Sequence, residues 1–69
     1  MKTIPLTSAE RIIKKAGAKR VSDDAKKELI KYLEEVGVKI SKIAQKLAIH
    51  AKRKTIKEED IKLASKELL

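Results

Sequence analysis

Residues 23–51 read DDAKKELIKYLEEVGVKISKIAQKLAIHA, and this stretch decides the fold. Apolar side chains recur along it at steps of three and four residues, which is the spacing of one face of an α-helix. The stripe consists of Ala25, Leu29, Leu33, Val36, Ile40, Ile43, Leu47 and Ala51. The spacing predicts one continuous helix of about 28 residues, roughly 42 Å long at 1.5 Å per residue.

The apolar face of this predicted helix is broad as well as long. Five further residues are expected to widen it: Ile30, Val38, Ala44, Ala48 and Ile49. Two short neighbours from the same chain cannot cover a face of this size. We therefore expect a second copy of the chain to cover it.

A short helix is predicted before the long one. Thr7-Ser8-Ala9-Glu10 has the spacing of a capping box, in which a hydroxyl accepts from an early helix N–H and the Glu reaches back to the cap. This helix is expected over about 8–16, with Gly17 supplying the left-handed residue that closes it. Ser22, followed by two aspartates, predicts the N-cap of the long helix.

A second short helix is predicted after the long one. Thr55 and Glu58 repeat the hydroxyl-to-Glu spacing, so this helix is expected over about 57–67. It carries an inward stripe of Ile61, Ala64 and Leu68, and a second stripe of Asp60, Leu63 and Glu67 that is rotated away from the first. Because the two stripes face different directions, we expect this helix to make two different contacts. Residues 1–69 are thus predicted to form a single all-α domain of a short, a long and a short helix.

Composition limits the classes of protein to consider. The chain has 69 residues, with 18 Lys and Arg against 10 Asp and Glu, and its net charge of +8 indicates an anionic partner. The absence of Cys removes disulfides, thiolate nucleophiles and Cys-based zinc sites. No stretch has signal-peptide character or approaches the roughly 18 apolar residues of a membrane span. We expect a soluble intracellular protein that relies on oligomerisation for stability.

Three classes of function fit the sequence poorly. The single histidine has no metal partner at helical spacing and the hydroxyl residues fall at caps, so we expect no catalytic residue, metal, cofactor or small-molecule substrate. A membrane-surface helix needs aromatic anchors, whereas the chain has one Tyr and neither Trp nor Phe. A sequence-reading helix-turn-helix protein brings Asn, Gln or Arg to base edges, and this chain has no Asn.

Basic side chains gather on the first predicted helix and in the two loops. Arg11, Lys14 and Lys15 lie on or beside one face of that helix, which by itself also fits an ordinary solvated face. The loops hold Arg20 and the run Arg53-Lys54-Thr55. Taken alone, Arg53 also fits an ordinary positive charge at the C-terminus of a helix, and Thr55 fits an ordinary helix cap.

Several motifs in the chain resemble those of one family. They are Arg11-Ile12-Ile13-Lys14, Ala16-Gly17-Ala18-Lys19-Arg20-Val21-Ser22-Asp23-Asp24-Ala25, Leu33-Glu34-Glu35, Lys46-Leu47-Ala48 with His50-Ala51, and Arg53-Lys54-Thr55-Ile56-Lys57 with Glu59-Asp60-Ile61. They cover nearly the whole chain without a gap, and the sequence closely resembles the archaeal histones. The resemblance implies a histone fold, an intertwined handshake homodimer, and dimers that bind, bend and wrap double-stranded DNA on the chromosome in the cytoplasm.

The resemblance also implies roles for the basic residues. Arg11 would enter a minor groove that faces the protein, and Lys14, with Lys15 beside it, would approach a phosphate. In the histone dimer the first loop of one chain lies beside the second loop of the other. Arg20 of one chain would then join Lys54 and Thr55 of the other in a phosphate clamp.

Two further contacts follow from the resemblance. Arg53 and Asp60 would form an ion pair within the chain that holds the second loop in shape. Leu47, His50, Asp60 and Leu63 would form a contact between dimers, so that dimers extend into tetramers or longer filaments on DNA. Related histone chains are implied as heterodimer partners.

The sequence departs from the family pattern at two places. Lys52 stands where a small Gly is common, and the chain ends in Glu67-Leu68-Leu69 instead of a basic tail. The alternatives to DNA wrapping are a histone-fold protein that pairs with another protein without touching DNA, and a factor that bridges or coats DNA. The net charge of +8 argues against the first of these.

Overall fold

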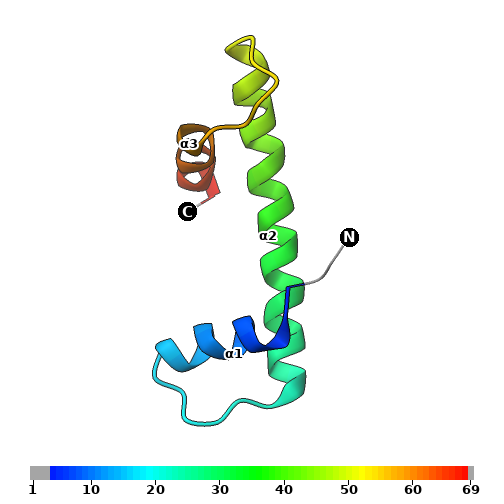
Figure 1. Ribbon diagram of the computed structural model, residues 1–69, viewed down its shortest axis with the longest axis vertical. Helices are drawn as coiled ribbons and strands as arrows, with labels where there is room; N and C mark the ends of the chain where they lie inside the picture. Colours follow the sequence, from blue (N-terminus) through cyan, green and yellow to red (C-terminus); the bar gives the residue numbers. More distant parts are fainter. Residues whose placement is uncertain (1–3, 69) are drawn as a thin grey trace. The chain divides into compact units, whose positions relative to one another are not determined.

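The computed structural model describes residues 4–68, and these contain three helices and no strand. They are α1 (Leu6–Lys15), α2 (Asp23–His50) and α3 (Glu58–Leu68) (Figure 1). The predicted all-α class and the short, long, short order are confirmed, and α2 has the predicted 28 residues. Leu69, the last residue of the non-basic C-terminus, lies outside the described residues.

The start of α1 differs from the prediction. The helix begins two residues earlier than expected, after Pro5, and no side chain caps it. The backbone carbonyl of Pro5 accepts from the N–H groups of Ser8 and Ala9 at 3.1 and 3.3 Å. Proline favours this place because its ring fixes φ and its missing N–H is not needed at a helix start. The predicted capping box is therefore wrong, and the Glu10 carboxylate contacts lysines instead.

The connection between α1 and α2 follows the sequence signals. Gly17 has φ of +106°, in the region that glycine favours, and its N–H donates to the carbonyl of Lys14 at 3.0 Å. Ser22 caps α2, because its Oγ accepts from the N–H of Ala25 at 3.1 Å. Both predictions are confirmed.

The end of α2 is a Schellman motif without a glycine. The N–H of Arg53 donates to the carbonyl of Ala48, and the N–H of Lys52 donates to the carbonyl of Ile49, both at 2.8 Å. This pair of bonds requires a left-handed residue just beyond the helix, usually Gly. Lys52 occupies that place with φ of +60°.

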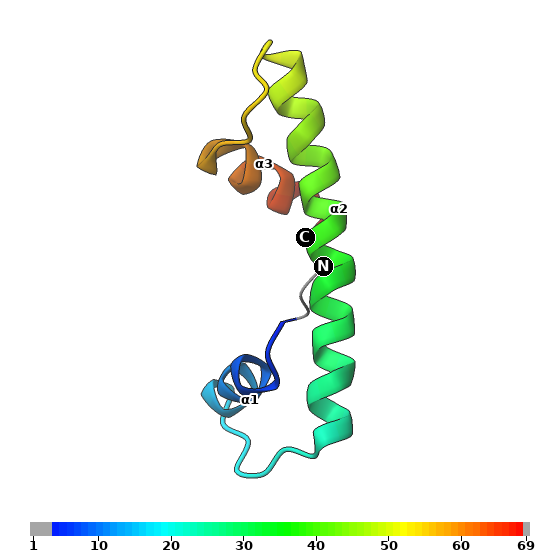
Figure 2. The same ribbon diagram turned by 45° about the vertical axis from the view of Figure 1, so that its right-hand side comes forward.

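The chain divides into two compact units, Met1–Glu35 and Val36–Leu69. In the first, α1 lies against the N-terminal half of α2 (Figure 2). Ala9 and Ile30 are buried in this unit. Lys26 of α2 joins the two helices, because its Nζ lies 3.6 Å from Glu10 Oε2 of α1. Its Nζ also lies 3.4 Å from Asp23 Oδ1 of its own helix. A single domain over 1–69 stays a prediction.

In the second unit, α3 lies beside the C-terminal half of α2 (Figure 2). The buried residues here are small, namely Ala44, Ala48 and Ala64, together with Asp60. Small side chains let two helices approach closely, but they bury little apolar surface. The second unit therefore has a thin core.

The apolar stripe of α2 is incompletely covered. Its six large members are half-buried: Leu29, Leu33, Val36, Ile40, Ile43 and Leu47. Among the described residues no large side chain is fully buried. The lone chain thus leaves uncovered the face for which the sequence predicts a partner.

Candidate nucleic-acid interface

The basic face of α1 is exposed. Arg11, Lys14 and Lys15 line a shallow, open depression together with Thr7 and Glu10. Lys14 also pairs with Glu10, whose Oε1 lies 3.2 Å from Lys14 Nζ. Hydrogen bonding and charge attraction from Lys14, with a further contribution from Lys26, hold the pKa of Glu10 below its ordinary value of 4.5. A phosphate at Lys14 would therefore compete with the Glu10 carboxylate.

The other predicted residue of the first unit, Arg20, lies in the connection between α1 and α2. It is exposed, and none of the ion pairs within residues 4–68 includes it. Its guanidinium is accessible to an anion.

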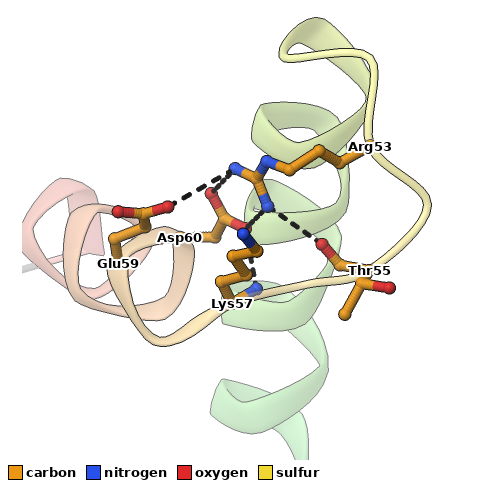
Figure 3. A network of polar contacts seen from close by, with 5 residues as sticks. All are labelled: Arg53, Thr55, Lys57, Glu59 and Asp60. Carbon is orange, nitrogen blue, oxygen red and sulfur yellow. Dashed lines mark hydrogen bonds and ion pairs between the residues drawn. The ribbon is translucent and has the colours of Figure 1, made fainter.

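The loop after α2 is organised by Arg53 (Figure 3). Its guanidinium meets Asp60 in a two-point contact, with Nη1 donating to Oδ2 at 3.0 Å and Nη2 to Oδ1 at 2.9 Å. Nη1 also donates to the backbone carbonyl of Thr55 at 3.0 Å, and Nη2 lies 3.9 Å from Glu59 Oε1. One arginine thus ties the loop to the start of α3, which gives the loop a defined shape.

Asp60 joins the loop to α3 through a second bond. Its Oδ2 accepts from the backbone N–H of Lys57 at 2.8 Å, and Lys57 immediately precedes α3. A carboxylate in the first turn that reaches back to the cap N–H is half of a capping box. The predicted cap from Thr55 to Glu58 is therefore wrong, and Asp60 performs that role.

The Arg53–Asp60 pair remains charged over a wide pH range. The hydrogen bond from Arg53 lowers the pKa of Asp60 below its ordinary value of 3.8, and the bond from the Lys57 N–H lowers it further. The same contact with Asp60 raises the pKa of Arg53. The Asp60 side chain is only 4% exposed, so the pair is shielded from water on the carboxylate side.

Lys54 and Thr55 lie on the exposed side of this loop. The Thr55 hydroxyl points away from the Arg53 network (Figure 3). No hydrogen bond in the described part of the chain uses that hydroxyl, and no ion pair there includes Lys54. Both side chains are accessible to an anion, whereas the guanidinium of Arg53 is occupied.

The four residues assigned to a contact between dimers all belong to the second unit. His50 is exposed and Leu63 is 53% exposed, whereas Leu47 is half-buried and Asp60 is buried. Ile49, which lies next to His50, is 63% exposed and was not assigned to this surface from the sequence. Each helical residue turns by about 100°, so Ile49 is rotated by about 200° from Leu47 and faces away from it.

The described residues offer no site for a metal ion, since no three His, Cys, Asp or Glu side chains gather among them. None of the helices there is long and apolar enough to cross a lipid bilayer. The chemistry available to the exposed basic side chains is the binding of anions.

We expect acid to weaken the fold through Asp60. Because its pKa is lower in the folded chain, the carboxylate stabilises the fold fully above its unfolded pKa, and this contribution disappears as the pH falls through the folded pKa. The Tm of the wild type should fall between roughly pH 5 and pH 2. The Tm of Asp60→Asn should be lower by roughly 5–10 °C at neutral pH and should fall less steeply in acid.

Thermal unfolding followed by circular dichroism across this pH range measures the effect. Glu59→Gln is the matched control, since it removes the same charge from a side chain that is 69% exposed. Glu10, whose pKa is also lowered, titrates in the same pH range in every variant and cancels in the comparison. Equal acid sensitivity of Asp60→Asn and the wild type would contradict the assignment.

Comparison with known proteins gives a consistent result. Residues 2–64 match the family described as histone-like transcription factor (CBF/NF-Y) and archaeal histone. The chain is 50% identical over 66 residues to one subunit of the archaeal histone HAN1 of Thermococcus zilligii, and the match covers 96% of this chain and 98% of the relative. It is 48% identical over 64 residues to probable archaeal histone 3 of Methanocaldococcus jannaschii, covering 93% and 96% respectively.

Proposed function

The chain belongs to the family of histone-like transcription factors (CBF/NF-Y) and archaeal histones, and from that premise we propose that it binds double-stranded DNA as a homodimer, bends it and compacts it. Family membership makes it a DNA-binding chromatin protein associated with the chromosome, and a structural protein rather than an enzyme. Wrapping of the DNA and assembly of dimers into longer filaments are part of the proposal.

The observation that carries the proposal is the loop between α2 and α3. Both terminal nitrogens of Arg53 are engaged by Asp60 and Thr55, and this fixes the loop so that Lys54 and the Thr55 hydroxyl remain exposed. No acidic residue occurs between Val36 and Lys57. A fixed loop with free cationic and hydroxyl groups suits the phosphate backbone, which dominates DNA affinity.

The proposed DNA-binding residues are those of α1 and of the two loops. Arg11 is assigned to a minor groove, and the others to phosphates. The phosphate-binding set is Lys14, Lys15, Arg20, Lys54 and Thr55. Backbone contacts of this kind carry no base-specific information, so any sequence preference comes from the ease with which the DNA bends.

Dimerisation is supported by the exposed surface of the lone chain. The large apolar side chains of the α2 stripe are only half-buried in the lone chain, so the stripe suits the same stripe of a second copy. A related histone chain would present a similar face, and the name of the relative from Thermococcus zilligii describes one subunit of a histone. A heterodimer is thus a second form of the proposal.

We place the contact between dimers on Leu47, His50, Asp60 and Leu63. His50 and Leu63 are the accessible members. Asp60 is 3% exposed, so its main contribution is to hold the start of α3, which carries Leu63. Two copies of this surface meeting face to face would extend dimers along DNA.

The test combines nuclease digestion with variants of matched charge. We expect the wild type on a long duplex to yield discrete protected fragments that lengthen in regular steps as the protein-to-DNA ratio rises. Arg11→Gln/Lys54→Gln should weaken that protection by at least tenfold in protein concentration, since each good charged contact contributes about 1 kcal/mol or more. Lys31→Gln/Lys66→Gln is the control, because it removes the same charge from exposed residues outside the proposed interface.

The pattern of digestion separates the alternatives. Protection without regular steps would leave DNA binding in place and favour a coating or bridging factor. No protection by the wild type would overturn the proposed function in favour of a histone-fold protein that binds only other proteins. Equal loss in the two double variants would show that net charge, and not the assigned residues, decides binding.

A further inference from the structure

Lys52 is the one non-glycine residue among residues 4–68 with a positive φ, at +60°. A side chain in this conformation is strained, because Cβ approaches the following carbonyl oxygen. The Schellman bonds that end α2 impose the conformation, and they would accept glycine without strain. The chain nevertheless has a long, charged residue there.

The surroundings of Lys52 do not explain its charge. It is exposed, and none of the ion pairs in the described part of the chain includes it. The carboxylate that organises the loop, that of Asp60, is occupied by Arg53 and Lys57. The end of the α2 dipole favours a cation, but Arg53 and Lys54 follow at once and already supply positive charge there.

The position of Lys52 suits a ligand shared with Lys54. The two residues are two apart, so their α-carbons are at most about 7 Å from each other. Both side chains are exposed, and the residue between them is fixed by the Asp60 contact. Two flexible ammonium groups on a fixed loop can therefore contact neighbouring phosphates of one nucleic-acid strand.

We propose that Lys52 is a further phosphate-binding residue, which extends the DNA contact of the second loop by one site in each chain. The inference rests on the proposed function, because its ligand is the DNA backbone. The strained backbone at Lys52 then lowers the stability of the fold and is retained because the side chain binds DNA. Local backbone strain often occurs at functional sites for this reason. Stability and DNA affinity should consequently respond in opposite directions when this residue is changed.

The main variant is Lys52→Gly, which removes both the charge and the strain. We expect its Tm to rise by a few degrees, while its affinity for duplex DNA falls on the order of 10- to 30-fold near 150 mM salt. The slope of log Kobs against log salt concentration should become shallower by about 1.8, since each of the two chains in a dimer loses one contact worth about 0.9. Fluorescence anisotropy with a labelled duplex over a range of salt concentrations measures both the affinity and the slope.

Three further variants separate charge from loop structure and from the proposed function. Lys52→Asn removes the charge but tolerates the left-handed conformation, and it should match Lys52→Gly in slope. Lys52→Arg should keep the wild-type slope. Lys54→Gln should make the salt dependence of DNA affinity shallower, as Lys52→Gly does, because it removes a contact of the proposed interface itself.

The outcomes are distinct. An unchanged slope for Lys52→Gly and Lys52→Asn, together with a reduced slope for Lys54→Gln, would overturn the role of Lys52 and leave the proposed function intact. A Lys52→Arg slope as low as that of Lys52→Gly would also overturn it, since charge would not be the cause. Failure of the wild type to bind duplex DNA would overturn the proposed function first and this inference with it.

Discussion

Ile40→Asp should prevent the chain from forming a cooperative folded dimer. Ile40 lies in the middle of the α2 stripe and is half-buried in the lone chain, because no element of the same chain covers it completely. In the proposed dimer a second α2 covers it. The carboxylate would then be buried without a partner, once in each chain.

The expected effect is comparable with the whole stability of a small protein. Loss of the isoleucine contacts costs about 2–5 kcal/mol per chain, and burial of an unpaired carboxylate adds further cost. The sum over two chains approaches or exceeds the roughly 5–15 kcal/mol that stabilises a typical fold. Sedimentation should show a monomer, and circular dichroism should show a large loss of helix without a sharp thermal transition.

Ser41→Asp is the matched control for this substitution. It introduces the same negative charge one residue further along α2, at an exposed position. We expect it to dimerise and to unfold with a Tm that rises with protein concentration, as linkage requires for a dimer. A helical Ile40→Asp monomer with the Tm of Ser41→Asp would contradict the proposed dimer interface.

The features predicted correctly from sequence are those set by local periodicity and local hydrogen bonding. The period of the apolar stripe determined the 28 residues of α2, because an uninterrupted amphipathic pattern has few other solutions. Ser22 and Gly17 were also predicted, since a hydroxyl cap and a left-handed glycine act on backbone groups within a few residues.

The errors arise where two local signals compete. The hydroxyl caps predicted for the two short helices were wrong, because Pro5 begins α1 earlier and because Asp60 outcompetes Thr55 at the start of α3. A carboxylate held by Arg53 is a stronger acceptor than a hydroxyl. Ile49 was expected to widen the apolar stripe, but its rotation from Leu47 turns it outward and leaves it 63% exposed.

Other parts of the candidate site depend on contacts between distant residues. The Arg53–Asp60 pair was predicted from the family resemblance. A separation of seven residues across a turn does not by itself determine the distance between the two side chains. The contact of Lys26 with Glu10 was missed, since it joins two helices whose packing the sequence pattern does not define. The left-handed conformation of Lys52 was missed as well, because lysine gives no local signal for it.

DNA affinity should depend steeply on salt concentration. Five positively charged residues per chain belong to the proposed interface, namely Arg11, Lys14, Lys15, Arg20 and Lys54, and Lys52 is inferred as a sixth. If a dimer makes on the order of 6 to 10 phosphate contacts, its affinity should fall by roughly 10³- to 10⁵-fold between 50 and 200 mM salt, because each neutralised phosphate releases condensed counterions. Titration of a labelled duplex at several salt concentrations gives the slope directly.

The same titration tests whether binding reads sequence or shape. A flexible duplex rich in TA and CA steps should bind more tightly than a stiff A-tract duplex, because bending it costs less, while both should have the same salt slope. Lys66→Gln should leave that slope unchanged, since Lys66 is exposed on the last turn of α3, outside the proposed interface. A flat salt response would refute phosphate contacts as the source of affinity. A strong preference between two duplexes of equal flexibility would require base contacts, which the exposed arginines and lysines would then have to make in the major groove.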